Sequence, residues 1–293
     1  MRITRIAALA AVAALSLSVV ACGGDDESSG ESGAASKTFE AGTTMERLNK
    51  AQKIIVGTKF DQPGFGLKGL DGKPAGFDVE IAKIIAEELG IPDDKIEYIE
   101  TPSAVREEVI EQGKADIVVA TYTINPKRKE RIDFAGPYYV AGQAILVKQA
   151  DTAITGPDSF KAGDKKVCSV QGSTPAANIE KFLANKGSQL VLFDVYQKCV
   201  DALKNGQVDA VTTDNVILTG FIANNEGQFK LAGEKFTEEP YGIGVKKGDA
   251  AFRTFINDTL EKSFTDGRYA EAWKNTAGKV DPNTPKTPTI NRY

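Results

Sequence analysis

Short apolar runs and helix-like stretches alternate along the chain from residue 54 to about residue 231. The apolar runs predict strands at 54–56, 96–99, 116–120, 167–170, 190–193 and 208–212. Helices are predicted between them, most clearly at 78–89 and 104–112, and two amphipathic helices follow at 249–264 and 268–276. Asp78 is expected to cap the first helix, which ends at Gly90. Such alternation is typical of an α/β fold, in which helices cover the faces of parallel sheets.

Part of this pattern occurs twice. In both copies a helix-ending glycine precedes a short strand, and a polar residue follows eight positions after the glycine, Thr121 in one copy and Asp214 in the other. In a second pair of segments, Lys59 and Thr174 each stand two residues after a strand-ending glycine. Any two α/β segments share such features, but two similar lobes are the favoured interpretation. Ligands of open α/β sheets bind beyond the carboxyl ends of the strands. These four residues are therefore expected around one cleft between the lobes.

The first 22 residues have the features of an export signal. Two arginines precede an apolar stretch at 6–20 that is short for a membrane span. The stretch leads to Cys22 in a setting that resembles the bacterial lipobox, whose cysteine is lipidated; the alternative is an ordinary secretory signal with an incidental cysteine. Residues 23–45 are rich in Gly, Ser and acidic residues and predict a flexible tether, and the tail at 281–293 is also predicted to be unstructured.

The charge balance and the absence of histidine exclude several functions. The 293 residues contain 36 Lys and Arg against 40 Asp and Glu, and the net charge of −4 gives no reason to expect nucleic-acid binding. A chain with no histidine cannot use Ser-His-Asp or Cys-His catalysis or His-ligated zinc. No metal and no cofactor are expected.

Export also decides what is expected of the three cysteines. Outside the cytoplasm thiols tend to pair, and with Cys22 assigned to lipid only Cys168 and Cys199 remain. A disulfide between them would close a loop of about 30 residues and contribute on the order of 3 kcal/mol to stability on the chain-entropy model. A redox or metal site is the alternative, although two thiolates do not complete a metal shell.

Two further patterns do not predict chemistry. Residues 64–69 fit Gly-x-Gly-x-x-Gly, but a turn and not a helix follows them, so a dinucleotide site is not expected. The acidic pairs Glu87-Glu88 and Glu107-Glu108 are predicted to lie on solvated helix faces and not to act as acid/base couples.

The segment from Ala120 to Tyr139 has the form Thr-x-Thr-Ile-x-x-x-Arg, ending at Arg128, followed by Asp-Phe-x-x-Pro-Tyr. In this it resembles the family 3 solute-binding proteins of polar amino acid ABC importers, and the resemblance extends over most of residues 50–278. The segment at 56–64 is similar to the glutamate-binding branch. The resemblance implies a two-lobed, type II periplasmic-binding-protein-like fold with mixed sheets flanked by helices. Its lobes would span 46–141 with 240–280, and 142–239, joined by a two-crossover hinge.

The resemblance also implies roles for residues that would hold the backbone of a free amino acid. Arg128 would clamp the α-carboxylate, since a guanidinium can make two parallel hydrogen bonds to it. Thr121, Thr123 and Thr174 would assist, with Thr174 also expected as a helix N-cap. Asp214 would bind the α-ammonium together with Thr121. The alternative for Arg128 is an exposed arginine in a basic run, and the alternative for Asp214 is an aspartate that only caps a helix.

Lys59 and Arg106 would contact the ligand's distal end, with Tyr196 as a further candidate carried only by spacing. Lys59 occupies the position where family members that bind cationic amino acids carry an acid, and Arg106 matches an arginine of the branch that binds acidic ligands. The alternative for both basic residues is an exposed surface position. Phe65 and Tyr122 would line the ligand's methylenes or belong to the core. One departure is that the family's aromatic residue before Pro-Phe is absent from the segment at 61–64, which leaves the stacking wall undefined.

The predicted function is an extracytoplasmic, lipid-anchored and monomeric protein that binds glutamate or a related polar amino acid by hinge closure and delivers it to an ABC permease. Contact with the membrane is expected only through the lipid. One alternative is a cyclohexadienyl dehydratase-like enzyme on the same fold, which the missing histidine argues against. The other is a sensor module that presents its ligand to a membrane receptor.

Overall fold

The structure is a computed structural model that describes residues 37–293. The predicted signal segment, Cys22 and most of the predicted tether lie outside the described residues. The last part of the tether prediction is corrected, because helix α1 (Thr44–Ala51) already begins at Thr44 and Thr43 caps it by accepting a hydrogen bond from the Glu46 N–H. Phe39 packs edge-on against Phe255, so this segment belongs to the folded body.

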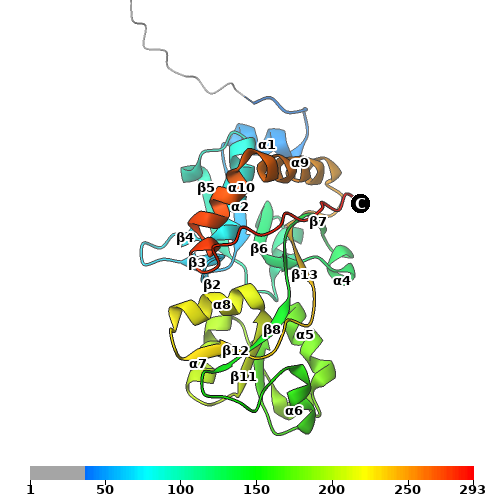
Figure 1. Cartoon of the computed structure of the whole chain (residues 1–293). Coiled ribbons are helices and arrows are strands. Elements are labelled where there is room, and N and C mark those ends of the chain that lie inside the picture. Colours follow the sequence, from blue (N-terminus) through cyan, green and yellow to red (C-terminus); the bar gives the residue numbers. More distant parts are fainter. Residues whose placement is uncertain (1–36) are drawn as a thin grey trace, which may run out of the picture. The chain divides into compact units, whose positions relative to one another are not determined.

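Two five-stranded sheets organise the chain (Figure 1). The first has the order β5-β1-β6-β13-β7. Its strands are β1 (Ile54–Thr58), β5 (Ile96–Glu100), β6 (Ile117–Thr123), β7 (Asp133–Ala141) and β13 (Glu239–Val245). Its helices are α2 (Phe77–Glu88), α3 (Arg106–Glu111), α4 (Pro126–Lys129), α9 (Ala250–Asp266) and α10 (Arg268–Asn275). Strands β1, β5 and β6 are parallel, and β13 is antiparallel to both of its neighbours. We call this sheet with its helices and α1 the first lobe.

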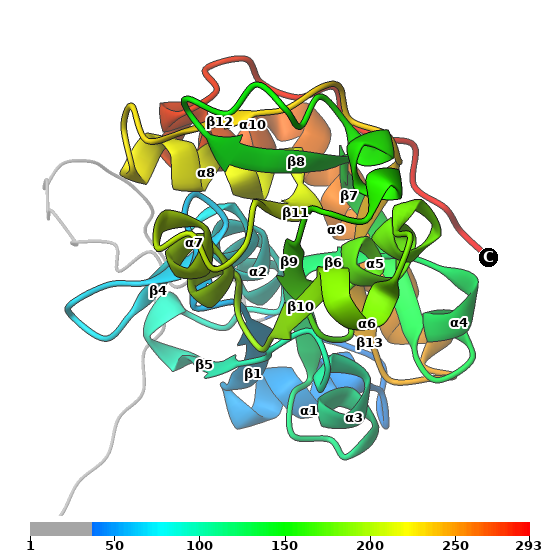
Figure 2. The same cartoon turned by 90° about the horizontal axis from the view of Figure 1, so that it is seen from below.

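The second sheet has the order β10-β9-β11-β8-β12. Its strands are β8 (Gln143–Lys148), β9 (Val167–Val170), β10 (Leu190–Phe193), β11 (Ala210–Asp214) and β12 (Phe229–Leu231). Its helices are α5 (Thr174–Ile179), α6 (Lys186–Gln189), α7 (Tyr196–Lys204) and α8 (Asn215–Asn224). Figure 2 shows α7 and α8 on one side of this sheet and α5 and α6 on the other. We call this sheet with its helices the second lobe.

Shorter elements complete the chain. A small antiparallel sheet in the first lobe consists of β2 (Asp61–Gln62), β3 (Gly66–Lys68) and β4 (Pro74–Ala75). Strand β3 lies within the Gly-x-Gly-x-x-Gly segment, and the Gly72 N–H donates to Gly69 O at 3.0 Å between β3 and β4, so the turn expected after the motif is confirmed. Four 3-10 turns lie at Asp93–Lys95, Pro157–Ala162, Glu180–Phe182 and Ala277–Lys279. The α/β class with mixed, helix-flanked sheets is confirmed. No helix within residues 37–293 combines the length and the apolar composition of a membrane span.

The chain passes between the two sheets twice, from β7 to β8 at Gly142 and from β12 back to β13. The two crossings pack closely, since a Cβ on Gly142 would stand 2.6 Å from the carbonyl oxygen of Thr237. The backbone N–H of Gln143 also donates to the Thr237 hydroxyl at 2.9 Å. The antiparallel strands at these crossings were not predicted, because their apolar runs lack the flanking βα pattern of the other strands.

The internal repeat has a physical basis in the backbone. Gly113 and Gly206 both adopt positive φ, 65° and 73°, where a residue with a Cβ is disfavoured. Three residues later, Asp116 and Asp209 each accept a hydrogen bond from a backbone N–H at the start of the adjacent parallel strand, at 2.8 and 2.7 Å. Each lobe therefore uses the same glycine turn and carboxylate to set the register of its strands.

The first lobe's core contains an aromatic cluster. Phe65 and Phe77 each pack edge-on against Trp273, and Tyr139 stacks on the same indole. Phe65 is 1 % exposed, so it belongs to the core and not to a ligand wall. The packing of Phe65 fixes the β2–β3 segment that carries Asp61 and Gln62 toward the second lobe.

Two local predictions are wrong. Gly76, at φ 139°, is the N-cap of α2, while Asp78 lies inside the helix and is fully buried. The tail after residue 281 has no helix or strand, yet it is not detached from the first lobe. Its Asn291 N–H donates to Gly136 O at 2.8 Å, and the hydroxyl of Tyr293 accepts from the Phe134 N–H at 2.8 Å. Proline and threonine richness did not reveal these contacts, because they depend on surface groups of a folded sheet.

Candidate functional site

A narrow cavity of about 10 Å³, which is room for about one water molecule, lies between the two lobes, at the carboxyl ends of strands from both sheets. Six of the eight predicted ligand residues line it, namely Arg106, Thr121, Thr123, Thr174, Tyr196 and Asp214. The other lining residues are Gln62, Ser103, Ser173, Pro175, Thr213 and Ile217. The structure thus brings together residues that are more than 150 positions apart in the sequence.

Arg128 does not line this cavity but lines a neighbouring open cleft of about 370 Å³, which shares Ser103, Ser173 and Thr174 with the cavity. Its guanidinium donates to Thr123 O at 2.7 Å in its own lobe and to Gly172 O at 3.1 Å in the other lobe. Burial, followed by the nearby charge of Arg106, lowers the pKa of Arg128 to about 10. Two of its five N–H groups hold backbone oxygens here, so the fork keeps donors for a ligand.

Glu107 corrects a sequence prediction. Its carboxylate lies 3.2 Å from Nε of Arg128, and its side chain is only 12 % exposed. It is therefore an orienting partner of Arg128 and not a member of a solvated face. The sequence did not reveal this, because the two residues meet only when α3 and α4 pack together.

Lys59 is buried at 4 % exposure, and its ammonium donates to the hydroxyl of Ser103 at 2.9 Å. Ser103 lines the cavity, whereas Lys59 itself does not. Burial, followed by the positive charge of Arg106, holds the pKa of Lys59 well below its usual value. A ligand carboxylate next to Ser103 would relieve this shift by supplying the missing negative charge.

Arg106 is also buried, so it is not a surface residue of its helix. Its NH1 donates to Ala120 O at 2.8 Å, and its Nε has no hydrogen-bond partner within residues 37–293. The guanidinium lies 4.0 Å from the ring centre of Tyr122, which is fully buried and outside the cavity lining. Tyr122 therefore supports the arginine through its ring face and does not line the ligand's methylenes.

Asp214 ends β11 and stands at the N-cap of α8, but its side chain makes no capping bond. One carboxylate oxygen accepts from the Tyr241 hydroxyl of the other lobe at 2.6 Å, while Oδ1 has no partner among the described residues. Burial raises the pKa of Asp214 to about 7, and the neighbouring Glu239 acts in the same direction. A buried acceptor of this kind favours a cationic partner.

Thr121 has a strained backbone at φ 45°, which is rare for a β-branched residue. Its N–H donates to Asp78 at 2.7 Å, and Asp78 also accepts from the Tyr138 hydroxyl at 2.6 Å. Burial raises the pKa of Asp78 to about 7. Asp78 was not among the predicted site residues, since the sequence analysis expected it only to cap a helix.

Gln62 occupies the place of the missing aromatic residue. Its side chain is fully buried, its oxygen accepts from the Thr121 hydroxyl at 3.0 Å, and its Nε2 has no partner within the described part of the chain. The cavity therefore has a polar amide donor where the family pattern has a stacking ring.

Thr174 is placed by α5, although Ser173 and not Thr174 is the N-cap, accepting from the Ala176 N–H at 3.1 Å. The Thr174 hydroxyl lies 3.3 Å from that of Thr123 and donates to Glu239 at 2.8 Å. Glu239 is 2 % exposed at the start of β13, and sequence reasoning did not find it. This carboxylate joins the second lobe to the returning hinge strand.

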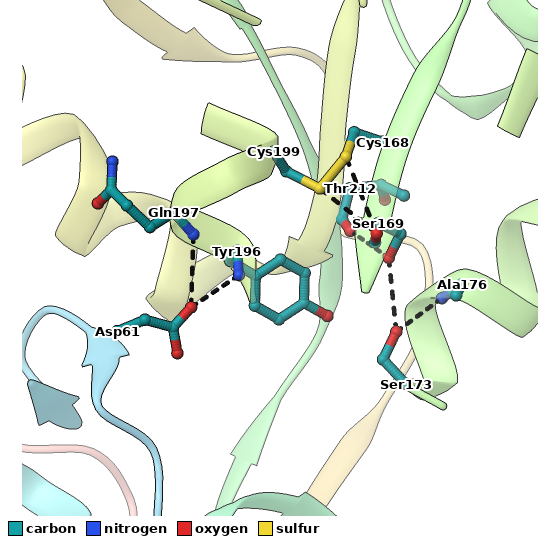
Figure 3. The surroundings of a disulfide bond; sticks show 9 residues. All are labelled: Asp61, Cys168, Ser169, Ser173, Ala176, Tyr196, Gln197, Cys199 and Thr212. Carbon is teal, nitrogen blue, oxygen red and sulfur yellow. Dashed lines mark hydrogen bonds between the residues drawn. A yellow bond between two sulfur atoms is a disulfide. The ribbon is translucent and has the colours of Figure 1, made fainter. Parts of the chain in front are cut away.

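The structure contains the expected disulfide between Cys168 and Cys199, with Cα atoms 5.5 Å apart (Figure 3). The bond fastens α7 to β9 in the second lobe. Tyr196, the first residue of α7, extends its ring from this fastened helix toward Ser173 (Figure 3). By fastening α7 to the sheet, the disulfide restricts the position of Tyr196 relative to the cavity.

The model of the bacterial extracellular solute-binding proteins, family 3, matches residues 54–277. The chain belongs to this family. It is 40 % identical over 296 residues to the glutamate-binding protein GluB of Corynebacterium glutamicum, covering 96 % of this chain and 95 % of that protein. It is 39 % identical to the ABC transporter glutamine-binding protein GlnH of Bacillus subtilis, covering 87 % and 90 %.

A solved structure of the family has the same fold. The solute receptor for L-cysteine of Neisseria gonorrhoeae superposes with a TM-score of 0.76 at 30 % identity, over 85 % of this chain and 99 % of that one. The predicted family and the type II binding-protein fold are confirmed. The three relatives are named as binding proteins or a receptor, so the dehydratase alternative gains no support from them.

Proposed function

We propose that this protein binds L-glutamate between its lobes and delivers it to the membrane subunits of an ABC importer. The observation that carries the proposal is the set of unpaired groups around one enclosed cavity. Within the described residues, Gln62 and Arg106 each carry a donor without a partner and Asp214 carries an acceptor without a partner, and all three residues line this cavity. A zwitterion with a second carboxylate supplies the complement of both. The printed names of the relatives in Corynebacterium and Bacillus support the same ligand class.

The α-ammonium would lie against Oδ1 of Asp214, where a charge-assisted hydrogen bond replaces an uncompensated acceptor. The α-carboxylate would lie near Thr123 and Thr174, within reach of the free N–H groups of Arg128. These residues come from both lobes, so the ligand's backbone contributes most when the cleft is closed. Closure is then favoured by the ligand, because only the closed form makes the contacts from both sides.

The distal carboxylate would lie near Ser103, between Lys59 and Arg106. Two buried positive groups within the same wall leave a strong preference for a negative ligand end. Glutamine offers only a dipole there, which leaves the two cations less well compensated. Tyr196 and Gln62 would flank the same end by hydrogen bonding.

Cys22 would supply the proposed attachment, with the segment that follows it as the tether. A lipid on Cys22 would hold the protein on the outer face of the plasma membrane, and each buried CH₂ of the acyl chains would contribute roughly 0.8 kcal/mol. Metabolic labelling with a fatty-acid analogue tests this step, since a Cys22→Ala variant should lose the label. Labelling that persists in this variant would contradict the assignment.

The ligand proposal is tested on the described domain after endogenous ligand has been removed by unfolding and refolding with the disulfide intact. A thermal-shift screen of the twenty amino acids should show the largest stabilisation with glutamate, because a ligand that binds only the folded state raises the melting temperature. Calorimetry then gives the affinities. Stabilisation by a cationic amino acid in preference to glutamate would refute the proposal.

A further inference from the structure

One contact between the lobes lies outside the cavity and holds the two sides of the cleft together. The carboxylate of Asp61, in β2 of the first lobe, accepts a hydrogen bond from the Tyr196 N–H at 2.7 Å and lies 3.4 Å from the Gln197 nitrogen (Figure 3). Both N–H groups belong to the first turn of α7 in the second lobe. We call this contact the inter-lobe cap.

The first turn of α7 needs an acceptor that its own sequence does not supply. The first four N–H groups of a helix have no partner inside the helix, and a Ser, Thr, Asp or Asn at the N-cap usually satisfies one of them. Val195 stands at the N-cap of α7 and has no acceptor on its side chain. The other lobe supplies the missing carboxylate, which also suits the positive end of the helix dipole.

The residues of the inter-lobe cap are adjacent to residues of the cavity. Gln62 follows Asp61 directly and lines the cavity, whereas Asp61 does not. Tyr196 takes part in both, with its N–H in the cap and its ring on the cavity wall. The disulfide between Cys199 of α7 and Cys168 of β9 restricts the movement of α7 relative to its sheet. A contact to the first turn of α7 therefore also holds β9 in position.

A second contact at the same seam admits only glycine. Gly220 of α8 faces Pro63, and a Cβ at Gly220 would stand 2.4 Å from the Pro63 carbonyl oxygen. Pro63 is two residues after Asp61, so the same segment of the first lobe approaches both helices. The close approach therefore depends on the lobes being together, and a methyl group would oppose it.

We infer that Asp61 is a positioning residue for ligand binding, which stabilises the closed cleft by capping α7 across the lobes without touching the ligand. When the lobes separate, the carboxylate and the two N–H groups return to water, so the cap contributes to the closed form alone. The inference rests on the proposed binding of an amino acid in the cleft. Because the cap stabilises closure itself and the Asp61 carboxylate does not line the cavity, it should act alike on glutamate and glutamine.

The test compares Asp61→Ala with Asp61→Asn and with a matched control, Asp194→Ala. Asp194 lies two residues before the same helix and pairs with Lys198 within the second lobe. Loss of a helix cap corresponds to a factor of about 3 to 30. In stopped-flow experiments Asp61→Ala should raise the dissociation rate by this factor for both ligands, with the association rate within about twofold. In Asp61→Asn the dissociation rate should stay close to that of the wild type, since an amide oxygen also caps a helix.

Gly220→Ala tests the inference independently, because it should lower ligand affinity without lowering the stability of the fold. Alanine favours a helix interior over glycine, so the ligand-free protein should melt at the same or a higher temperature. The affinity for both ligands should nevertheless fall, because the added methyl group keeps the lobes apart. Unchanged affinity in Gly220→Ala together with unchanged dissociation in Asp61→Ala overturns the inference while leaving the proposed ligand intact.

Hydrogen exchange provides an arm that needs no amino acid ligand. The amides of Tyr196 and Gln197 should exchange faster in Asp61→Ala than in the wild type or Asp194→Ala, with no change in β9. If no amino acid binds, the proposed function fails, and the inter-lobe cap is then judged by this exchange alone. Equal exchange in all three proteins at these amides would falsify it.

Discussion

Replacing Lys59 by methionine gives the sharpest test of how the distal end of the ligand is read. The substitution keeps an unbranched side chain of similar length and removes only the charge. Lys59 is buried, and its ammonium is joined to Ser103 at 2.9 Å on the cavity wall. Removing one partner of a buried, hydrogen-bonded charge pair costs about 2–4 kcal/mol. The glutamate dissociation constant should therefore rise roughly 30- to 700-fold.

The same substitution should affect glutamine and the empty protein differently. Glutamine has no distal charge to lose, so its affinity should change by no more than about fivefold. The pKa of Lys59 is lowered in the folded protein by burial and by Arg106. A lysine whose pKa is lowered on folding destabilises the folded state over the pH range below its unfolded pKa, so the empty site is destabilised by this group. Lys59→Met should raise the melting temperature of the ligand-free protein.

Isothermal titration calorimetry with glutamate and glutamine on ligand-stripped protein measures both effects. Lys68→Met is a matched control, since Lys68 is an exposed lysine on the nearby strand β3 whose ammonium lies over the Phe60 ring. It should leave both affinities unchanged. An equal loss of glutamate and glutamine affinity in Lys59→Met would show that Lys59 supports the fold of the cleft and does not read the distal carboxylate.

Three further predictions address the ligand's backbone, the pH dependence and the tail. Arg128→Ala should weaken glutamate binding by about 2–4 kcal/mol, because it leaves the buried carboxylate of the ligand without its partner. The control Arg47→Ala, on the exposed face of α1, should not. If calorimetry gives both variants the same glutamate affinity, Arg128 does not belong to the site. Burial, followed by the charge of Glu239, raises the pKa of Asp214 to about 7. Because an ammonium binds the ionised carboxylate, glutamine affinity should increase as pH rises from about 6 to 8, with proton release near pH 7. The same number of released protons in an Asp214→Asn variant would point to another group. Tyr293→Ala should lower the unfolding free energy by about 1 kcal/mol without changing glutamate affinity. The reason is that the centre of the Tyr293 ring lies 3.6 Å from the Lys129 ammonium and 4.2 Å from the Arg253 guanidinium. An unchanged denaturation midpoint would contradict this.

Much of the fold follows from local features of the sequence. The periodic apolar runs predict most parallel strands and their helices to within a few residues, because each strand buries a short apolar run and each helix a broad apolar stripe. Where the chain runs antiparallel, at β7, β8 and β13, the prediction fails, since those strands are recognised only by their partners. The sequence was similarly silent about the tail, whose stability comes from contacts with Phe134 and Gly136.

The candidate site divides in the same way. Residues at the ends of predicted strands, such as Thr121, Thr174 and Asp214, could be found because the carboxyl ends of strands meet at one edge of a sheet. Gln62, Asp78 and Glu239 could not, because what marks them is burial together with hydrogen bonds to distant segments, which no local pattern encodes. Glu107 was assigned to solvent for the same reason.

The two α/β lobes, the family and the cysteine pair could be inferred from the sequence alone, because they depend on local periodicity, on motifs and on counting. The folded structure was needed to show which polar groups are buried without partners, that Arg128 lies beside the cavity and not in its wall, and that Asp61 caps a helix of the other lobe. Those properties arise when separate segments of the chain come within hydrogen-bonding distance and water is excluded from between them.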